Sequence, residues 1–348
     1  MDHLFLLFCL AWARAGDRPS PRKSCGWPAQ RRSRDFHNRH LDSRSRVLDL
    51  WRWQLGFGPQ EEPALPRGMV PPYQAAIITP DLVQLNRPDP AKIQVTWVGH
   101  STFLIQMAGV NILTDPIWSE RASPVTFAGP KRHAPPGLKW QNLPTIDAVV
   151  ISHNHYDHLD LATVKRLGNQ SGFFVPLGLA RWFNEAGLSN VVELDWGESA
   201  GLGSIKLHSV PAQHFSSRGL FDRDVSLWSS WVLEGPSGRV FFSCDTGYSP
   251  DFKEIGERFS PVRLSLLPIG GYQPRWFMRP MHVDPPEAVK IHQDLRSRQS
   301  IGMHWGTFKL TDEPLGEPPL YLARSLAEAS LAPESFLVLK IGETRAFQ

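Results

Sequence analysis

The chain has 348 residues, a net charge of +3 at neutral pH, 41% hydrophobic residues and 20% charged residues. This length and composition indicate a folded protein with a large core, and they exclude a disordered chain and a small disulfide-stapled scaffold. Its three cysteines, Cys9, Cys25 and Cys244, are widely spaced and odd in number, so they indicate neither a disulfide framework nor a cysteine-rich zinc site. The longest apolar run, residues 4–13, is shorter than the roughly 17 to 25 residues that a membrane-spanning helix needs.

The positive charge is concentrated near the N-terminus. Residues 14–52 contain 11 Lys and Arg against 4 Asp and Glu, which together with Asp2 leaves a net charge of −3 for residues 53–348. Residues 46–53, Arg-Val-Leu-Asp-Leu-Trp-Arg-Trp, are amphiphilic. Two interpretations are open: a segment that contacts a membrane surface, or a solvated basic tail whose two tryptophans pack on the domain. Residues 1–15 are similar to a secretory signal peptide, with a small-residue pattern at residues 13–15 but no basic start.

The segments that follow predict a layered α/β protein. Residues 57–90 contain eight prolines, which exclude long helices and central strands there. From residue 92 onward, short β-rich runs separated by turn residues predict strands, and helical patterns then alternate with further strands. An order that is first rich in strands and then mixed indicates sheets with helices outside them. We expect strands at 93–98, 102–107, 110–113, 148–151, 173–175, 191–194, 205–210, 230–234, 240–244, 264–267, 300–303 and 336–340, and helices at 161–167, 179–185, 285–295 and 320–329.

One short stretch carries most of the chemical information. After the apolar strand at 148–151, the sequence Ser-His-Asn-His-Tyr-Asp-His places three imidazoles and a carboxylate within six positions, 153–158. Neutral imidazole and carboxylate without thiolate suit zinc or a similar first-row cation. A loop that follows a buried strand also lies at the edge of a sheet, where scaffolded loops commonly host chemistry. The stretch therefore predicts a metal site.

The His-x-His-x-Asp-His pattern after an apolar strand resembles the signature of the metallo-β-lactamase superfamily. That resemblance implies an α/β protein, a four-layer αββα sandwich, with a binuclear metal site at one edge. Three further candidates each follow a predicted strand: His214, Asp245 and His304. By resemblance, one metal is held by His153, His155 and His214, the other by Asp157, His158 and His304, and Asp245 bridges the two.

A narrower resemblance covers the chain from about residue 90 to its C-terminus. Several segments that metal binding alone does not require are similar to the N-acyl-phosphatidylethanolamine-hydrolysing phospholipase D family. They include Thr96-Trp97-Val98-Gly99-His100-Ser101, Leu113-Thr114-Asp115-Pro116, Pro274-Arg275-Trp276-Phe277-Met278 and His304-Trp305-Gly306-Thr307-Phe308. We therefore expect a variable basic segment over residues 1–70 and a catalytic domain over residues 71–348.

The family resemblance implies a zinc-dependent phospholipase D with two zinc ions per chain. Such an enzyme hydrolyses N-acyl-phosphatidylethanolamine to N-acylethanolamine and phosphatidic acid by attack of a metal-bridging hydroxide, with Asp157 and Asp245 as its catalytic carboxylates. Two cations roughly 3.5 to 4 Å apart suit this reaction, because they activate water and clamp phosphoryl oxygens. The resemblance further implies a homodimer that associates peripherally with the cytosolic face of internal membranes. A signal peptide at residues 1–15 would instead direct the chain to the secretory pathway.

Other residues are candidates for supporting roles. His100 and Asp115 resemble family positions that orient metal ligands through hydrogen bonds. Tyr156, His282, Arg275 and Trp276 are candidate substrate contacts, with the arginine placed to meet a phosphate. Met281 stands where the family pattern has a polar residue, so we expect it to affect acyl or headgroup preference.

Three other functions are consistent with parts of the sequence. The first is a phosphodiesterase or lactonase of the same fold that acts on a soluble substrate. The second is a non-catalytic membrane-binding protein with structural metals, against which Asp157 and Asp245 argue. The third, a nucleic-acid enzyme, is disfavoured because residues 53–348 are net negative and present no basic stripe, so we expect no nucleic-acid partner.

Overall fold

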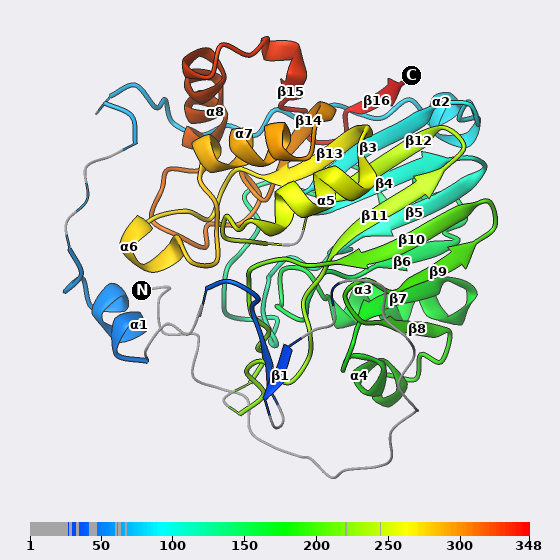
Figure 1. Ribbon diagram of the computed structural model, residues 1–348, viewed down its shortest axis with the longest axis horizontal. Coiled ribbons are helices and arrows are strands. Elements are labelled where there is room, and N and C mark those ends of the chain that lie inside the picture. Colours follow the sequence, from blue (N-terminus) through cyan, green and yellow to red (C-terminus); the bar gives the residue numbers. More distant parts are fainter. Residues whose placement is uncertain are drawn as a thin grey trace.

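The computed structural model describes residues 27, 30–32, 35–41, 47–59, 61, 64–66, 68–219, 221–243 and 245–348. The expected signal-like segment, residues 1–15, lies outside the described residues. Within them, two seven-stranded mixed sheets pack face to face with helices on both outer faces, which is the expected four-layer αββα sandwich (Figure 1).

The first sheet contains the earlier strands and closes with the last one. Its order is β16-β3-β4-β5-β6-β7-β8, antiparallel from β16 to β5 and parallel from β5 to β8. The strands are β3 (Ile93–Gly99), β4 (Thr102–Met107), β5 (Val110–Thr114), β6 (Ala148–Val150), β7 (Gly172–Pro176), β8 (Val191–Leu194) and β16 (Thr344–Phe347).

The second sheet repeats this design. Its order is β15-β14-β13-β12-β11-β10-β9, antiparallel from β9 to β12 and parallel from β12 to β15. The strands are β9 (Ser199–Leu202), β10 (Ile205–Val210), β11 (Ser230–Gly235), β12 (Gly238–Phe242), β13 (Val262–Pro268), β14 (Ser297–Met303) and β15 (Phe336–Leu337).

Three apolar cores hold the four layers together. The central core between the sheets includes Val95, Ile105, Leu207, Trp231 and Leu266, all buried. A second core joins the outer face of the first sheet to α2 (Leu82–Asn86), α3 (Leu161–Leu167) and α4 (Ala180–Glu185). A third joins the second sheet to α5 (Asp251–Phe259), α7 (Pro285–Asp294) and α8 (Glu317–Glu328). These two helix layers lie on opposite sides of the sandwich in Figure 1.

The described parts of the N-terminal segment pack on the domain. Trp27 precedes a short hairpin of β1 (Gln30–Arg32) and β2 (Asp35–His37), and Phe36 lies in β2. Both side chains are buried in the core under α5 and α7. Helix α1 (Val47–Gln54) lies against α6 (Arg275–Met278), where Trp53 packs on Phe277 with ring centroids 5.3 Å apart (Figure 1).

Most expected elements are confirmed, with shifts at their ends. The helix expected at 285–295 is α7, and Asp284 caps it by accepting a hydrogen bond from the Glu287 backbone N–H. The strand expected at 336–340 ends at Leu337, because the chain then turns to bury Leu339 and Ile341 in the central core. Helix α5 was not predicted, although buried Phe252, Ile255 and Phe259 recur with helical spacing. Strands β9 and β16 at the sheet edges were also not predicted.

The central core generates a stability prediction. Leu207→Ala removes a fully buried side chain from between the sheets, so we expect a loss of about 2 to 5 kcal/mol in the free energy of unfolding. Leu161→Ala at the start of α3, where the side chain is 40% exposed, is the matched control, with an expected change within about 0.5 kcal/mol. Urea unfolding measures both, and equal losses would contradict the layered packing.

Candidate metal centre

The predicted ligands gather at one edge of the sandwich, where strands of both sheets end. The loop after β6 carries residues 153–158, and Asp115 follows β5. In the second sheet, His214, Asp245 and His304 follow β10, β12 and β14. Strands β5 and β6 are parallel, as are β12, β13 and β14, so their carboxyl ends share an edge within each sheet. The topology thus explains why residues as far apart in the sequence as Asp115 and His304 lie at the same edge.

Hydrogen bonds tie the two sheets together at this edge. The Ser229 backbone N–H donates to the Ser152 carbonyl at 2.8 Å, and the Trp231 indole donates to the Ile151 carbonyl at 3.0 Å. The His304 backbone N–H donates to the His100 carbonyl at 3.2 Å. Because these bonds join backbone immediately beside the predicted ligands, the relative position of the two sheets fixes the geometry of the site.

The first group consists of His153, His155 and His214. Their candidate ligand nitrogens all lie within 4.8 Å of one another. His153 Nε2 is 2.8 Å and His214 Nε2 is 3.4 Å from His155 Nδ1. The other ring nitrogens have separate partners: His214 Nδ1 lies 2.9 Å from the Met281 carbonyl oxygen, and His153 Nδ1 lies 2.8 Å from Ser152 Oγ. Each of these two imidazoles therefore turns Nε2 toward the shared point.

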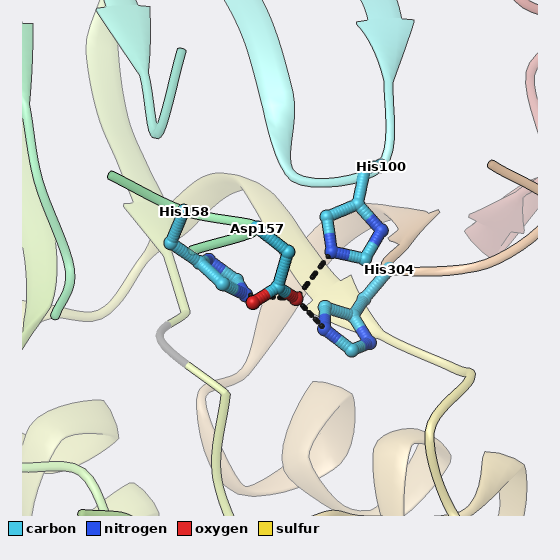
Figure 2. Close-up of side chains that lie close together, drawn as sticks. All are labelled: His100, Asp157, His158 and His304. Carbon is cyan, nitrogen blue, oxygen red and sulfur yellow. Dashed lines mark hydrogen bonds and ion pairs between the residues drawn. The ribbon is translucent and has the colours of Figure 1, made fainter. Parts of the chain in front are cut away.

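The second group centres on one carboxylate oxygen (Figure 2). Asp157 Oδ2 lies 2.8 Å from His100 Nε2, 3.2 Å from His158 Nε2 and 3.3 Å from His304 Nε2. Figure 2 shows all three imidazoles turned toward this carboxylate, with His100 on the turn between β3 and β4. His100 thus contacts a predicted ligand directly.

Asp245 lies between the two groups. Its Oδ2 is 2.9 Å from His304 Nε2 and 3.2 Å from His158 Nε2, both in the second group. It also has a ligand oxygen within 4.8 Å of ligand nitrogens of His214, from the first group, and of His282. Asp245 is therefore a carboxylate that lies near members of both groups.

Asp115 anchors the ligand loop through hydrogen bonds to Ser152 and His158. Its Oδ2 lies 2.6 Å from His158 Nδ1 and accepts the Ser152 hydroxyl at 2.5 Å, while its Oδ1 accepts the Ser152 backbone N–H at 2.7 Å. A hydrogen on His158 Nδ1 shared with Asp115 leaves Nε2 facing Asp157 and Asp245. This is the arrangement by which carboxylates orient metal-binding imidazoles.

Burial sets the protonation of the first group. Removal from water disfavours the charged imidazole, and neighbouring histidines add to this effect at His153 and His214. The pKa of His155 and of His214 falls to about 3, and that of His153 falls well below its ordinary value. All three side chains are therefore neutral near pH 7, which is the state in which imidazole binds a metal.

In the second group, neighbouring charges affect the pKa values more than burial does. Burial alone would raise the pKa of Asp157 and Asp245, but the charges and hydrogen bonds of the surrounding histidines, His158 foremost, together outweigh it, and both pKa values lie well below normal. Burial would likewise lower the pKa of His158 and His304, yet the two carboxylates raise the first well above normal and the second to about 9. The carboxylates thus attract positive charge to this point.

These residues fit a metal cation by their own chemistry. In the described part of the chain, Asp245 Oδ1 and His304 Nδ1 are buried without a hydrogen-bond partner, while His158 Nε2 and His304 Nε2 lie close to carboxylate oxygens without hydrogen-bond geometry. Buried polar atoms without partners are costly, and so is positive or negative charge without compensation. A cation among the same nitrogens and carboxylates would satisfy the atoms and take the place of the protons on His158 and His304. The donor set is the imidazole and carboxylate mixture of zinc sites.

The backbone is strained where the site is built. His100, Asp115 and His304 have φ values of 54°, 33° and 60°, a region that residues other than glycine rarely occupy. Such conformations cost about 1 to 3 kcal/mol each and persist only where the surroundings impose them. Three site residues in this region indicate that the fold tolerates a loss in free energy of unfolding in order to place the side chains of the site.

Comparison with known proteins gives the same fold and chemistry. The family model of the beta-lactamase superfamily domain matches residues 110–305. The chain is 44% identical over 263 residues to N-acyl-phosphatidylethanolamine-hydrolyzing phospholipase D 1 of Caenorhabditis elegans, covering 71% of this chain and 74% of that protein. It is 35% identical over 298 residues to the mitochondrial enzyme of that name from Saccharomyces cerevisiae, covering 83% of this chain and 63% of that protein.

The chain belongs to the N-acyl-phosphatidylethanolamine-hydrolysing phospholipase D family. It is thus an enzyme of the metal-dependent hydrolase class within the metallo-β-lactamase superfamily. A metallo hydrolase from Ignicoccus hospitalis has the same fold, with a TM-score of 0.56 at 23% identity over 74% of this chain and 99% of that one. The family model lies inside residues 71–348, and the domain boundary at residue 70 stays a prediction.

The candidate substrate contacts of this family member lie at different distances from the centre. His282 is part of it, with Nδ1 3.8 Å from Asp245 Oδ2. The Tyr156 hydroxyl donates to the Arg218 carbonyl at 3.0 Å.

Arg275 donates to the His282 carbonyl and to Glu287, each at 2.7 Å, and lies 3.3 Å from Asp284, so carboxylates already surround its charge. Trp276 packs with Phe277 and beneath Arg52, beside α1. Their contact with substrate stays a prediction.

Two residues that hold the ligand loop were not predicted from the sequence. Ser152 joins Asp115 to His153, and its position directly before the first histidine is the signal that could have identified it. Arg218 donates to the carbonyls of Asn154 and Leu159, each at 2.8 Å, and so spans the loop. No local motif marks Arg218, because its partners lie about 60 positions away.

The position of Asp115 generates a prediction about metal retention. Asp115→Asn leaves an amide group against either Ser152 or His158, so we expect zinc affinity to fall about 10- to 100-fold. Asp89→Asn is the matched control, since Asp89 is an exposed partner of Lys92. Zinc content after dialysis against a graded series of chelator concentrations measures both. Retention of zinc equal to that of the parent would contradict the role of Asp115.

Proposed function

We propose that this metal-dependent hydrolase is a zinc-dependent phospholipase D that hydrolyses N-acyl-phosphatidylethanolamine to N-acylethanolamine and phosphatidic acid. The observation that carries the proposal is the convergence of seven predicted ligands into two groups joined by Asp245. The names of the two relatives supply the substrate class. Since the chain covers 63% of the yeast relative and 74% of the nematode one, the activity of those whole proteins is carried here only as a proposal.

The proposed ligand sets follow the two groups. His153, His155 and His214 would hold one zinc ion, and Asp157, His158 and His304 the other, with Asp245 contacting both. The contacts of Asp245 with His158 and His304, and its proximity to His214, support this division. His282 lies close enough to Asp245 to meet the substrate beside the metals, as we proposed from the sequence.

Two zinc ions bound here would activate a water molecule and offset the charge of the phosphodiester oxygens. The residues of the chain keep the site ordered for this reaction. Asp115 orients His158, the Met281 carbonyl orients His214, and His100 holds Oδ2 of Asp157. In the overall hydrolysis, the water oxygen joins phosphorus, the bond from phosphorus to the N-acylethanolamine oxygen breaks, and that oxygen takes up a proton. Asp157 and Asp245 are the carboxylates on which this chemistry depends.

An apolar cluster beside the centre supports a lipid substrate. Phe277, Met278 and Met281 are buried and pack with Leu50, Trp53, Phe215 and Trp276. The cluster reaches the metal ligands directly, because the Phe215 ring lies 4.6 Å from the His155 ring. The Met281 side chain belongs to this cluster while its carbonyl contacts His214, which supports its proposed effect on substrate preference.

The outer surface of α1 supports peripheral contact with a membrane. Leu48, Leu55 and Phe57 are 70%, 59% and 72% exposed, and Trp51 is 44% exposed, while Leu50 and Trp53 pack inward on the apolar cluster around α6. Helices in the described part of the chain all lack the length and apolar character needed to cross a bilayer. We propose that these four exposed side chains enter the headgroup region of a lipid surface.

Location and assembly follow from the family resemblance. We propose the cytosolic face of internal membranes, with the secretory pathway as the alternative if residues 1–15 act as a signal. The yeast relative carries the word mitochondrial in its name. A homodimer is also part of the proposal, and light scattering in detergent at several protein concentrations tests it.

Activity on vesicles tests the proposed reaction. Asp157→Asn is expected to lower the release of N-acylethanolamine at least about 100-fold, because the substitution removes the charge that three imidazoles share. The far-UV circular dichroism spectrum should be unchanged. Asp147→Asn, at a carboxylate that accepts the Asn111 backbone N–H at the opposite end of β5, is the control. Product release that is insensitive to chelator would contradict zinc dependence, and hydrolysis of soluble esters without release from vesicles would favour the soluble-substrate enzyme.

Vesicle sedimentation tests the membrane contact. Leu48→Glu places a charge on the exposed face of α1, so we expect vesicle binding to weaken about 10-fold. Val83→Glu in α2 is the matched control because Val83 is 69% exposed, close to the 70% of Leu48. Equal binding by the two variants would argue against α1 as the contact surface.

A further inference from the structure

A loop with two glycines, Gly270 and Gly271, lies against the imidazoles of His282 and His304. The loop follows β13, and Gly271 has a φ of +86°. A Cβ atom on Gly271 would lie 3.1 Å from His304 Cε1 and 3.2 Å from His282 Nδ1, and one on Gly270 would lie 2.4 Å from the His304 carbonyl oxygen. The loop therefore lies against both rings, whose centroids are 5.6 Å apart, and leaves no room for a side chain at Gly271.

A buried carboxylate from a distant segment holds this loop. Glu313 is 6% exposed, and its Oε1 accepts the Gly271 backbone N–H at 2.6 Å and the Thr311 hydroxyl at 2.8 Å. Its Oε2 accepts the Gln273 backbone N–H at 3.1 Å. The backbone adds a further bond, since the Asp312 N–H donates to the Gln273 carbonyl at 3.1 Å.

The bonding pattern requires a carboxylate. Both oxygens of Glu313 accept backbone N–H groups, which are two positions apart in the loop. A glutamine has one acceptor oxygen, so its NH₂ group would face one of the two backbone N–H donors. A buried carboxylate is costly unless its oxygens are satisfied, and here three donors satisfy them.

We propose that Glu313 is a positioning residue for the metal centre. By fixing the backbone at Gly271 and Gln273, it keeps the loop packed against the His282 and His304 rings. The loop in turn holds the His304 ring in the orientation that directs Nε2 toward Asp157 and Asp245. The inference rests on the proposed metal site and extends it to a residue whose side-chain hydrogen bonds are to Gly271, Gln273 and Thr311.

Metal affinity and histidine spectra test this role without reference to any lipid. In Glu313→Gln we expect the weaker of the two zinc sites to lose affinity about 10-fold, measured by competition with a chromophoric chelator. In ¹H–¹⁵N spectra of the zinc-loaded protein, the ring signals of His282 and His304 should shift while those of His153 stay in place. A general loss of packing would move all histidine signals and lower both affinities.

A second buried glutamate provides the matched control. Glu317 is 2% exposed and its Oε1 accepts the Tyr272 hydroxyl at 2.5 Å, a bond that an amide oxygen also accepts. Glu317→Gln should therefore bind zinc like the parent. Parent-like zinc affinity and histidine spectra in Glu313→Gln would overturn the proposal, as would an equal loss in Glu317→Gln.

Hydrogen exchange on the unaltered, zinc-loaded chain keeps the proposal testable if Glu313→Gln fails to fold. The amides of Gly271 and Gln273 should be protected, because both donate to Glu313. Exchange at the rate of an exposed loop would overturn the proposal. A parent protein that binds fewer than two zinc ions would instead refute the proposed function, so the two failures are distinguishable.

Discussion

The need to neutralise buried charge governs this structure. Asp157 and Asp245 lie among imidazoles at an edge that both sheets close, with 13% and 2% of their side chains exposed. In that setting an uncompensated carboxylate destabilises the folded state by far more free energy than a surface ion pair contributes to it. The pKa values reflect this cost, since His158 and His304 hold protons that burial alone would remove. A metal cation at the same point would compensate this charge.

The sandwich supplies the rigidity that such a centre needs. Each sheet contributes ligands from the ends of its strands, and backbone bonds such as Ser229 to Ser152 hold the two edges in register. The same segments connect the centre to the outside. Met281 contacts His214 through its carbonyl, and its side chain joins the apolar cluster under α1. One residue therefore contacts both the metal centre and the cluster on which the proposed membrane-facing helix packs. A lipid held at the surface would therefore meet the metals across a short apolar path.

Residue patterns predicted most strands, and the family resemblance predicted the four layers and which side chains gather at this edge. The pattern of residues 153–158 is local and its chemistry is distinctive, so it was the part that the sequence could identify by itself. The resemblance also placed His100 and Asp115 near the centre, where each now has a defined hydrogen-bond partner. Long-range contacts were beyond its reach. Glu313 holds Gly271 across 42 positions, and Arg275, expected to meet phosphate, is surrounded by Asp284 and Glu287 on the next helix. Side-chain partners of this kind depend on packing, which spacing along the chain does not encode.

We propose that the two groups of ligands hold two separate cations bridged by Asp245. Anomalous X-ray diffraction from zinc-loaded crystals, recorded on both sides of the zinc absorption edge, tests it most directly. The account predicts two anomalous peaks per chain, one among His153, His155 and His214 and one among Asp157, His158 and His304, with Asp245 in contact with both. A single peak, or a peak away from Asp245, would contradict it.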